Sequence, residues 1–299
     1  MPRYRLTVAY DGTDFKGWQK QHPQDSEPLR TAQGTLESCA RAVMKEPLNL
    51  LGASRTDSGV HALGQTAAFT SDRALEPERL IRALNSWLPP DVLVSRVGVV
   101  DEDFNPISGA REKQYRYVIG HGGKRGAPRP LFDRPHVTFS PEVLDAGAMQ
   151  AAANHLVGTH DFAAFTKLHH GRESTVRTVT SCQVSADGPH RVRIDVCGEG
   201  FLWNMVRIIA GTLHEVGRGR MDADAIPDVI ASGERRAAGP TMPPEGLSLL
   251  WIRYDGDAPA ADLVATVEAA SGAGHDTMID RLTAMPWAAA DALCPEPAP

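Results

Sequence analysis

The spacing of apolar residues over the first hundred positions predicts alternating strands and helices. Residues 4–10 alternate between apolar and polar, which is typical of a half-buried strand, and Asp11-Gly12 ends it. Helical spacing begins after Thr31, a candidate N-cap, and again at Pro77. Further strands are predicted at 65–70 and 92–100, and the second helix carries the apolar residues Leu80, Ile81, Leu84, Trp87 and Leu88.

The chain from residue 113 to residue 254 uses the same elements, with two strands in direct succession near its middle. The predicted strands are 113–119, 175–186, 190–197 and 247–254. The predicted helices are 141–156 with Pro141 in its first turn, a long helix with the apolar stripe Leu202, Val206, Ile209, Leu213 and Val216, and a short one at 222–232. This order favours the α+β class with largely antiparallel sheets over a doubly wound parallel sheet.

A boundary near residues 105–112 divides the chain into an N-terminal α/β domain, 1–108, and a C-terminal α/β domain, 109–255. Residues 256–299 form an acidic, alanine-rich tail that we expect to be partly disordered. The tail holds seven acidic residues and one basic residue, and therefore the whole net charge of −6. Residues 1–255 are balanced, with 30 basic and 30 acidic residues, so charge neither forbids nor suggests a nucleic-acid partner.

Composition excludes several classes of protein. Hydrophobic residues make up 42% of the 299 residues and charged residues 23%, as in globular proteins and unlike disordered or fibrous ones. The sequence has no apolar run near the roughly 18 residues that span a bilayer and no signal-peptide pattern, so no membrane partner is expected. Its cysteines lie far apart, which indicates a reducing cytoplasm rather than a disulfide framework: Cys39, Cys182, Cys197 and Cys294.

The densest polar segment is the glycine-bounded loop of residues 52–65. Arg55, Asp57 and His61 lie close together in it, and Arg55 and Asp57 share a face if the segment is extended. A loop with such groups is a candidate site. The alternative is an ordinary hairpin loop with an Asx-turn at Asp57 and a surface ion pair.

Common metal and cofactor motifs are missing from the sequence. His169 and His170 are adjacent and converge poorly on one ion, and His61 lacks an HxxxH partner. Residues 122–126 do not fit a phosphate-binding P-loop, and residues 198–200 lack the third glycine of a dinucleotide fingerprint. We therefore expect chemistry without a metal or a cofactor.

Two further residues have two interpretations each. Arg207 lies among apolar neighbours on the predicted long helix, where it either reaches water along its aliphatic stem or pairs with an acid. Tyr115 lies on a predicted strand, where a tyrosine is either packed in the core or part of a site.

The segment Gly-Ala-Ser-Arg-Thr-Asp-Ser-Gly-Val-His-Ala at 52–62 resembles the GAGRTDAGVHA signature of the tRNA pseudouridine synthase A family. Six further segments match family motifs in order: 8–19, 31–37, 113–117, 158–162, 200–207 and 239–247. Seven matches in the family's order over about 240 residues are specific to this family, whereas a single GRTD tetrapeptide is not. Ser54 and Ser58 replace the usual Gly and Ala, the loop at 22–30 is longer than expected, and the tail matches nothing.

The resemblance implies the pseudouridine synthase fold, with two α/β halves, largely antiparallel sheets flanked by helices and the active-site cleft between them. It implies an isomerase that converts uridine to pseudouridine at positions 38 to 40 in the anticodon arm of tRNA, without a cofactor, on an extruded nucleotide. Asp57 matches the catalytic aspartate, Arg207 the arginine that pairs with it and Tyr115 the active-site tyrosine. Arg55 matches the arginine that displaces the target base, and Leu247 the apolar residue that lines the pocket.

Phosphate contacts are expected from basic residues near these motifs, because RNA backbones bind Lys and Arg. The candidates are Lys124, Arg125, Arg129, Lys167, Arg172 and Arg177, with Lys16, Lys20 and Arg111 as similar ones; each has a solvated surface position as its alternative. The resemblance also implies a homodimer whose shared groove contacts one tRNA. A synthase of the same fold with another RNA target, or a non-catalytic RNA-binding module, remains an alternative.

Overall fold

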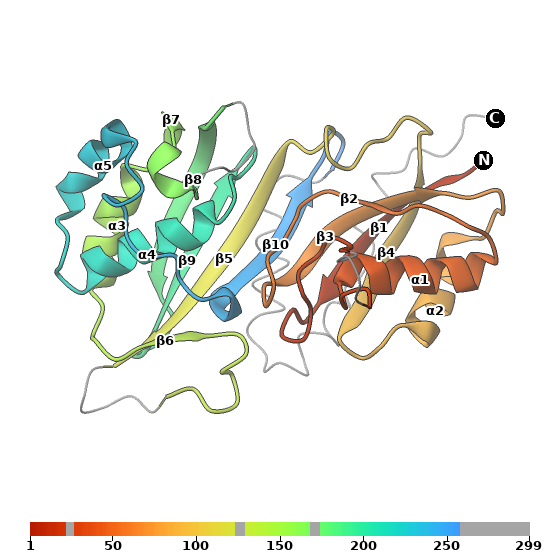
Figure 1. Ribbon diagram of the computed structural model, residues 1–299, viewed down its shortest axis with the longest axis horizontal. Helices are drawn as coiled ribbons and strands as arrows, with labels where there is room; N and C mark the ends of the chain where they lie inside the picture. Colours follow the sequence, from red (N-terminus) through yellow and green to blue (C-terminus); the bar gives the residue numbers. More distant parts are fainter. Residues whose placement is uncertain (22–26, 123–128, 168–173, 258–299) are drawn as a thin grey trace.

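The computed structural model describes residues 1–21, 27–122, 129–167 and 174–257. Ten strands form one mixed sheet: β1 (Arg3–Tyr10), β2 (Leu51–Gly52), β3 (His61–Thr70), β4 (Val92–Val100), β5 (Glu112–His121), β6 (Thr138–Ser140), β7 (Gly158–Asp161), β8 (Val176–Ala186), β9 (Arg191–Gly198) and β10 (Leu247–Arg253). Eight strands lie in the order β4-β1-β3-β10-β5-β9-β8-β7, while β2 pairs with β3 and β6 with β5 (Figure 1). Apart from the parallel pairs β3–β10 and β5–β6, the pairing is antiparallel, which confirms the predicted α+β class.

Within the described part of the chain, five α-helices flank this sheet: α1 (Ala32–Met44), α2 (Pro77–Trp87), α3 (Ala146–Asn154), α4 (Met205–Gly217) and α5 (Ile226–Ser232). Figure 1 shows α1 and α2 beside the strands of the N-terminal half and the other three helices beside the second half. The predicted N-cap is confirmed, since the Thr31 hydroxyl accepts the Gly34 N–H. In the described residues, no helix combines the length and apolarity needed to cross a membrane.

Three helix predictions need correction. The helix expected at 141–156 begins only at Ala146, because the Asp145 carboxylate caps it by accepting the Ala148 N–H at 3.0 Å; Pro141 lies outside. The long helix begins at Met205, after Asn204 with its left-handed φ of 60°, so Leu202 precedes it. The helix expected at 222–232 is a 3₁₀ turn followed by α5.

Trp87 does not lie on a buried face of α2, as its spacing predicted. Its side chain is 67% exposed, whereas Leu80 and Leu84 are completely buried. Trp87 is the last residue of the helix, and the chain turns away at Pro89, so helical periodicity no longer determines which side chains are covered.

The last strand, β10, lies in the middle of the sheet between β3 and β5 and joins the two halves of the chain (Figure 1). Because β10 and β3 are parallel, with Ser248 opposite His61, the loops that precede them meet at the same edge. A Cβ built on Gly59 would lie 2.9 Å from the Pro244 ring, which shows how closely these loops approach. The predicted division after residue 108 stays a prediction.

Candidate active site

The loop of residues 53–60 is held by hydrogen bonds with the segment that follows β1. Trp18 N–H donates to Thr56 O at 3.1 Å, and the Ser58 hydroxyl donates to Phe15 O at 3.2 Å. Gly17 has a φ of +88°, and a Cβ there would lie 2.7 Å from Thr56 O. The glycine therefore permits both the left-handed turn and the close approach that position the loop.

A second set of contacts fixes the start of this loop from the sheet. Gln65 on β3 accepts the Ser54 N–H at 3.2 Å and donates to Ser54 O at 2.6 Å. The Lys113 ammonium on β5 donates to Ala53 O at 3.0 Å. The sequence pattern did not identify Gln65 as a residue that positions the loop. Its contact with Ser54 depends on the pairing of strands, which appears only in the folded structure.

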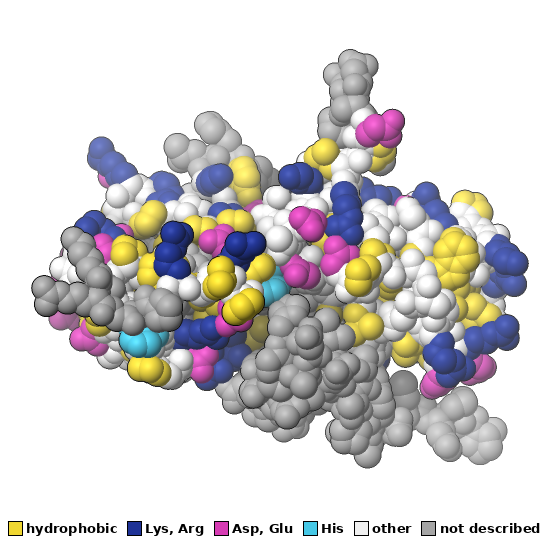
Figure 2. Space-filling view, turned by 90° about the horizontal axis from the view of Figure 1, so that it is seen from below, with side chains coloured by type: hydrophobic (Ala, Val, Ile, Leu, Met, Phe, Trp, Pro, Cys, Tyr) yellow, Lys and Arg dark blue, Asp and Glu magenta, His cyan; other side chains and the backbone are white. Residues whose placement is uncertain are grey.

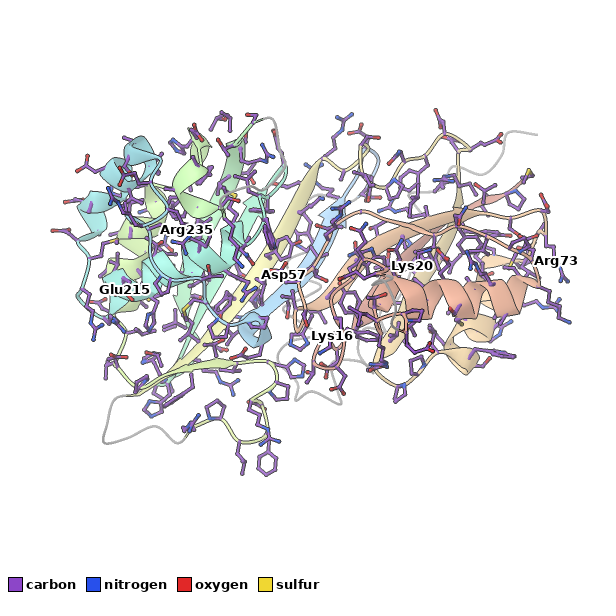
Figure 3. The ribbon with its side chains drawn as sticks, in the orientation of Figure 1. Lys16, Lys20, Asp57, Arg73, Glu215 and Arg235 are labelled. Atoms are coloured by element: carbon purple, nitrogen blue, oxygen red, sulfur yellow. The ribbon has the colours of Figure 1, made fainter. Side chains whose placement is uncertain are left out.

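Asp57 and Arg207 form an ion pair, with Arg207 Nη1 2.9 Å from Asp57 Oδ2. Of the two interpretations of Arg207, the paired one is confirmed. The same guanidinium donates from Nε to Met242 O at 2.7 Å and from Nη1 to Asn204 Oδ1 at 3.0 Å, so its plane is fixed. Figure 3 shows Asp57 at the junction between the two halves of the sheet.

The backbone approach that brings Met242 to Arg207 depends on a glycine in α4. A Cβ on Gly211 would lie 1.8 Å from Pro240 O, so the segment 239–242 packs directly on the helix backbone. Met242 N–H then donates to Arg207 O at 3.2 Å, which ties this segment to the turn that carries the arginine.

Tyr115 is buried on β5, and its hydroxyl lies 2.9 Å from the Ser54 hydroxyl. Burial raises the pKa of Tyr115 to about 12, the hydrogen bond with Ser54 opposes this, and the negative charge of Asp57 adds to it. The Phe201 ring meets the tyrosine ring edge-on, with centroids 5.3 Å apart. The tyrosine is thus both a packed residue and a neighbour of the Asp57 carboxylate.

Leu247 is buried at the start of β10, opposite Tyr117. Leu249 lies opposite Tyr115 in the same register, so all four side chains lie on the same face of the sheet. Leu247 is therefore diagonal to Tyr115 across this strand pair, and its role as a pocket residue stays a prediction.

Arg55 is exposed on the loop and has no hydrogen bond or ion pair with the rest of the described chain. Asp57, two residues further, is turned toward Arg207, and Thr56 between them is buried with its hydroxyl 2.7 Å from the Tyr10 hydroxyl. Of the groups in the loop, Arg55 is the one that a ligand reaches without displacing a protein contact.

The predicted phosphate contacts are only partly within the described residues. Lys167 lies with its ammonium 4.8 Å from the centre of the Trp203 ring, and Arg129 lies 5.9 Å from that of Phe139. Lys124, Arg125 and Arg172 lie outside the described residues. Lys20 and Arg111 are already paired, with Glu37 and Asp255, and Arg177 donates to backbone oxygens at 174 and 176. Figure 2 shows basic side chains toward both ends of one face, with acidic side chains among them.

Trp203 is a site residue that the sequence analysis did not identify. Its indole N–H lies 3.2 Å from Asp57 Oδ1, the carboxylate oxygen that Arg207 does not bind. It stands in an apolar run just before α4, so its spacing gave no signal of a polar contact.

Asp11, His61 and His136 bring three potential metal ligands within 4.8 Å of one another. His61 Nδ1 accepts the Gly12 N–H at 2.9 Å, and its Nε2 lies 2.8 Å from Pro135 O. Both nitrogens of His61 are therefore used within the protein, and a metal bound at Nδ1 would displace the Gly12 N–H. The expected lack of a metal site stays a prediction.

A carboxylate paired with an arginine, next to a buried tyrosine, forms a polar candidate active site at the centre of an α+β sheet. A family model described as "tRNA pseudouridine synthase" matches residues 6–105 and 152–255. These ranges include Asp57, Arg207 and Leu247, while Tyr115 lies between them. The chain belongs to the tRNA pseudouridine synthase family, and the resemblance predicted from its motifs is confirmed.

Relatives of this chain carry the name tRNA pseudouridine synthase A, and three of them serve as examples. Those of Acetivibrio thermocellus and Geotalea uraniireducens are 41% and 42% identical over 254 residues, which are 85% of this chain and all of the relative. That of Myxococcus xanthus is 41% identical over 275 residues, 92% of this chain and all of the relative. The function is that of a tRNA pseudouridine synthase, an isomerase that converts uridine to pseudouridine. Among solved structures, a chain in the crystal structure of a Cbf5-Nop10-Gar1 complex is 11% identical, with a TM-score of 0.37 over 92% of this chain and 59% of its own.

Proposed function

We propose that this chain isomerises uridines at positions 38, 39 and 40 in the anticodon stem-loop of tRNAs, with Asp57 as the group that attacks the nucleotide. The ion pair between Asp57 and Arg207 carries the proposal. The guanidinium, with its Nη1 2.9 Å from Asp57 Oδ2, holds the carboxylate in one place, as a nucleophile or general base at a reacting centre requires. The relatives' name and the motif at 52–62 support the choice of tRNA.

The reaction balances without another reactant. The bond from uracil N1 to ribose C1′ breaks, a bond from C5 to C1′ forms, the hydrogen at C5 leaves and N1 gains one. A stacked uridine is inaccessible to the carboxylate, so the nucleotide is extruded into the site. Arg55, exposed beside Asp57, displaces the target base, and the buried Leu247 lines the pocket that receives it.

Tyr115 acts as a neutral phenol, because burial raises its pKa to about 12. The Tyr115 ring lies beside the base. The phenol oxygen accepts the proton from C5 while the phenol gives up its own hydroxyl proton. The Ser54 hydroxyl, 2.9 Å away, is placed to accept that proton as it passes its own to solvent water, and solvent returns one proton to N1. Ser54 stands where the family pattern has glycine, so this relay belongs to this chain's own sequence.

The remaining predictions complete the proposal. Residues 1–108 supply Asp57, and residues 109–255 supply Tyr115, Arg207 and Leu247, so the two predicted domains form the two walls of the site. Two copies of the chain form a homodimer in the cytoplasm and share a groove in which Lys and Arg contact the tRNA backbone: Lys124, Arg125, Arg129, Lys167 and Arg172. Sedimentation equilibrium with and without tRNA tests the dimer, and a monomer under both conditions would contradict it.

The test of the proposal is tritium release from tRNA transcripts labelled at uridine C5, because bond formation at C5 expels that hydrogen. Wild type should release tritium from transcripts with uridine at 38, 39 or 40, and not when these are changed to cytidine. Asp57→Asn should bind tRNA and release none. Asp228→Asn is the matched control, since Asp228 is an exposed carboxylate on α5, and it should match wild type.

Each other outcome contradicts a defined part of the proposal. Release from the cytidine-substituted transcripts would show that the target lies elsewhere in the tRNA. Binding without release over a complete tRNA set would favour another RNA target or a non-catalytic RNA-binding module. An active Asp57→Asn variant would show that the carboxylate is not the attacking group.

A further inference from the structure

The indole of Trp203 contacts the Asp57 carboxylate with its polar edge and is partly open to solvent. Its Nε1–H donates to Asp57 Oδ1 at 3.2 Å, while half of its side-chain surface, 50%, stays exposed. A large aromatic ring with one polar edge on a catalytic carboxylate and an open surface is suited to contact both the protein and a ligand.

The indole N–H gives the carboxylate a second donor. Rotation of a carboxylate about its last bond is broad, so one hydrogen bond leaves its plane poorly defined. Arg207 holds Oδ2 at 2.9 Å and Trp203 holds Oδ1, and together these donors fix the plane. Of the two oxygens, Oδ1 has the neutral and longer hydrogen bond, so it is the one more easily released to a nucleotide.

Trp203 is held in this position by contacts of the backbone just before α4. Its carbonyl oxygen accepts the hydroxyl of Thr166, which is buried, at 3.1 Å. The next residue, Asn204, has a left-handed backbone, and its side chain accepts no helix N–H; instead its Oδ1 accepts from Arg207. The contact with Asp57 therefore belongs to the same rigid turn that holds the arginine.

The exposed ring also lies beside a cation. The Lys167 ammonium is 4.8 Å from the ring centroid, and Lys167 follows Thr166 directly. An aromatic face next to a lysine is the combination with which proteins bind unpaired nucleotides, the base on the ring and the phosphate on the cation. Each stacked base contributes about 1–3 kcal/mol in such sites.

We infer that Trp203 couples the catalytic carboxylate to the RNA: its N–H orients Asp57, and its exposed ring, with Lys167, is the surface on which a nucleobase of the bound tRNA stacks. This inference rests on the proposed role of Asp57. Trp203 thus has two roles: it positions Asp57 for the reaction, and it binds the RNA. Different substitutions of Trp203 distinguish these roles.

The experiment compares Trp203→Phe, which keeps a ring and removes the donor, with Trp203→Leu, which removes both. Single-turnover rates are measured at saturating tRNA and the Kd by anisotropy of labelled tRNA. Trp203→Phe should lose about tenfold in rate with a Kd within about twofold of wild type. Trp203→Leu should show the same rate loss and a Kd raised about tenfold. Lys167→Gln should raise the Kd and lower the salt slope of binding by about one.

Tryptophan fluorescence distinguishes base stacking from a purely structural role of Trp203, because a structural role predicts no change in indole emission when tRNA binds. A base stacked on the indole quenches it, so tRNA should quench wild type more than Trp203→Phe. Trp87→Phe is the matched control: Trp87 is exposed on α2, and its loss should leave the rate and Kd unchanged and the tRNA-induced drop in emission intact. Thermal unfolding establishes that all variants are folded.

A wild-type rate in Trp203→Phe would overturn the positioning role. Equal Kd values in Trp203→Phe and Trp203→Leu, or equal quenching in wild type and Trp203→Phe, would overturn the stacking role. Quenching needs no turnover, so it also separates this inference from the proposed function: an active Asp57→Asn variant refutes the role of the carboxylate, while the quenching difference still reports the ring contact.

Discussion

Replacing Arg207 by lysine keeps the positive charge and removes the geometry of the site. The guanidinium uses Nε for Met242 O and Nη1 for Asp57 and Asn204. Lysine has one ammonium nitrogen in place of a planar fork and cannot serve both directions, so we expect Arg207→Lys to lose the aligned contact with the carboxylate.

The magnitude follows from the exposure of the pair. A hydrogen bond between charged groups contributes about 1.5–3 kcal/mol. The side chains of Arg207 and Asp57 are 15% and 29% exposed, so solvent screens the pair in part and about 2 kcal/mol is the appropriate value. At 1.36 kcal/mol for each factor of ten, the rate at saturating tRNA should fall about thirtyfold. Arg207→Met should fall further, because Asp57 then keeps only the indole N–H of Trp203.

The assay is single-turnover tritium release at saturating tRNA, with thermal unfolding to establish that each variant is folded. Arg236→Lys is the matched control: Arg236 pairs with Glu234 on the surface, its side chain is 86% exposed, and its replacement should leave the rate unchanged. A folded Arg207→Lys variant within about threefold of the wild-type rate would falsify the reasoning.

Three further predictions concern the loop and its surroundings. Gly17→Ala should lower the free energy of unfolding by about 1–2 kcal/mol or more in urea titrations, because φ is +88° and the new Cβ meets Thr56 O at 2.7 Å; unchanged stability would contradict the close approach. Burial acts to raise the pKa of Asp11, but the nearby His61 imidazole and the two hydrogen bonds that the Thr13 hydroxyl and backbone N–H donate outweigh it and hold this pKa well below its ordinary value. The ionised carboxylate thus stabilises the fold above about pH 4, and the stability difference between wild type and Asp11→Asn should shrink as pH falls below that; a difference that grew would refute the sign. In ultraviolet titration, wild type should show a phenol with a pKa of about 12 that Tyr115→Phe lacks, and a loss near pH 10 instead would contradict the burial of that hydroxyl.

The sequence determined most of the local structure, because hydrophobic spacing and capping act over a few residues. Alternation predicted β1, helical spacing after Thr31 predicted α1, and the succession of strands near 175–197 predicted antiparallel pairing. The glycine-bounded loop at 52–65 was identified as a candidate site from composition alone. The spacing argument failed at helix ends, as with Trp87 and Pro141, where packing and capping rather than periodicity decide burial and boundaries.

The tertiary structure decided which of these segments meet. Asp57 and Arg207 are 150 residues apart, and Asp57 and Trp203 are 146 apart. β10, the last strand along the chain, lies parallel to β3 in the middle of the sheet and brings the loops before both strands to one edge. Met242, in the loop before β10, binds Arg207 on α4 and so links that helix to the edge where Asp57 lies. The approach of His136 to Asp11 has the same origin in contacts between distant segments. Periodicity indicates which side of a helix or strand is buried. The partner of a polar side chain depends instead on strand order and register, which result from contacts between distant segments and cannot be read from the spacing of neighbouring residues.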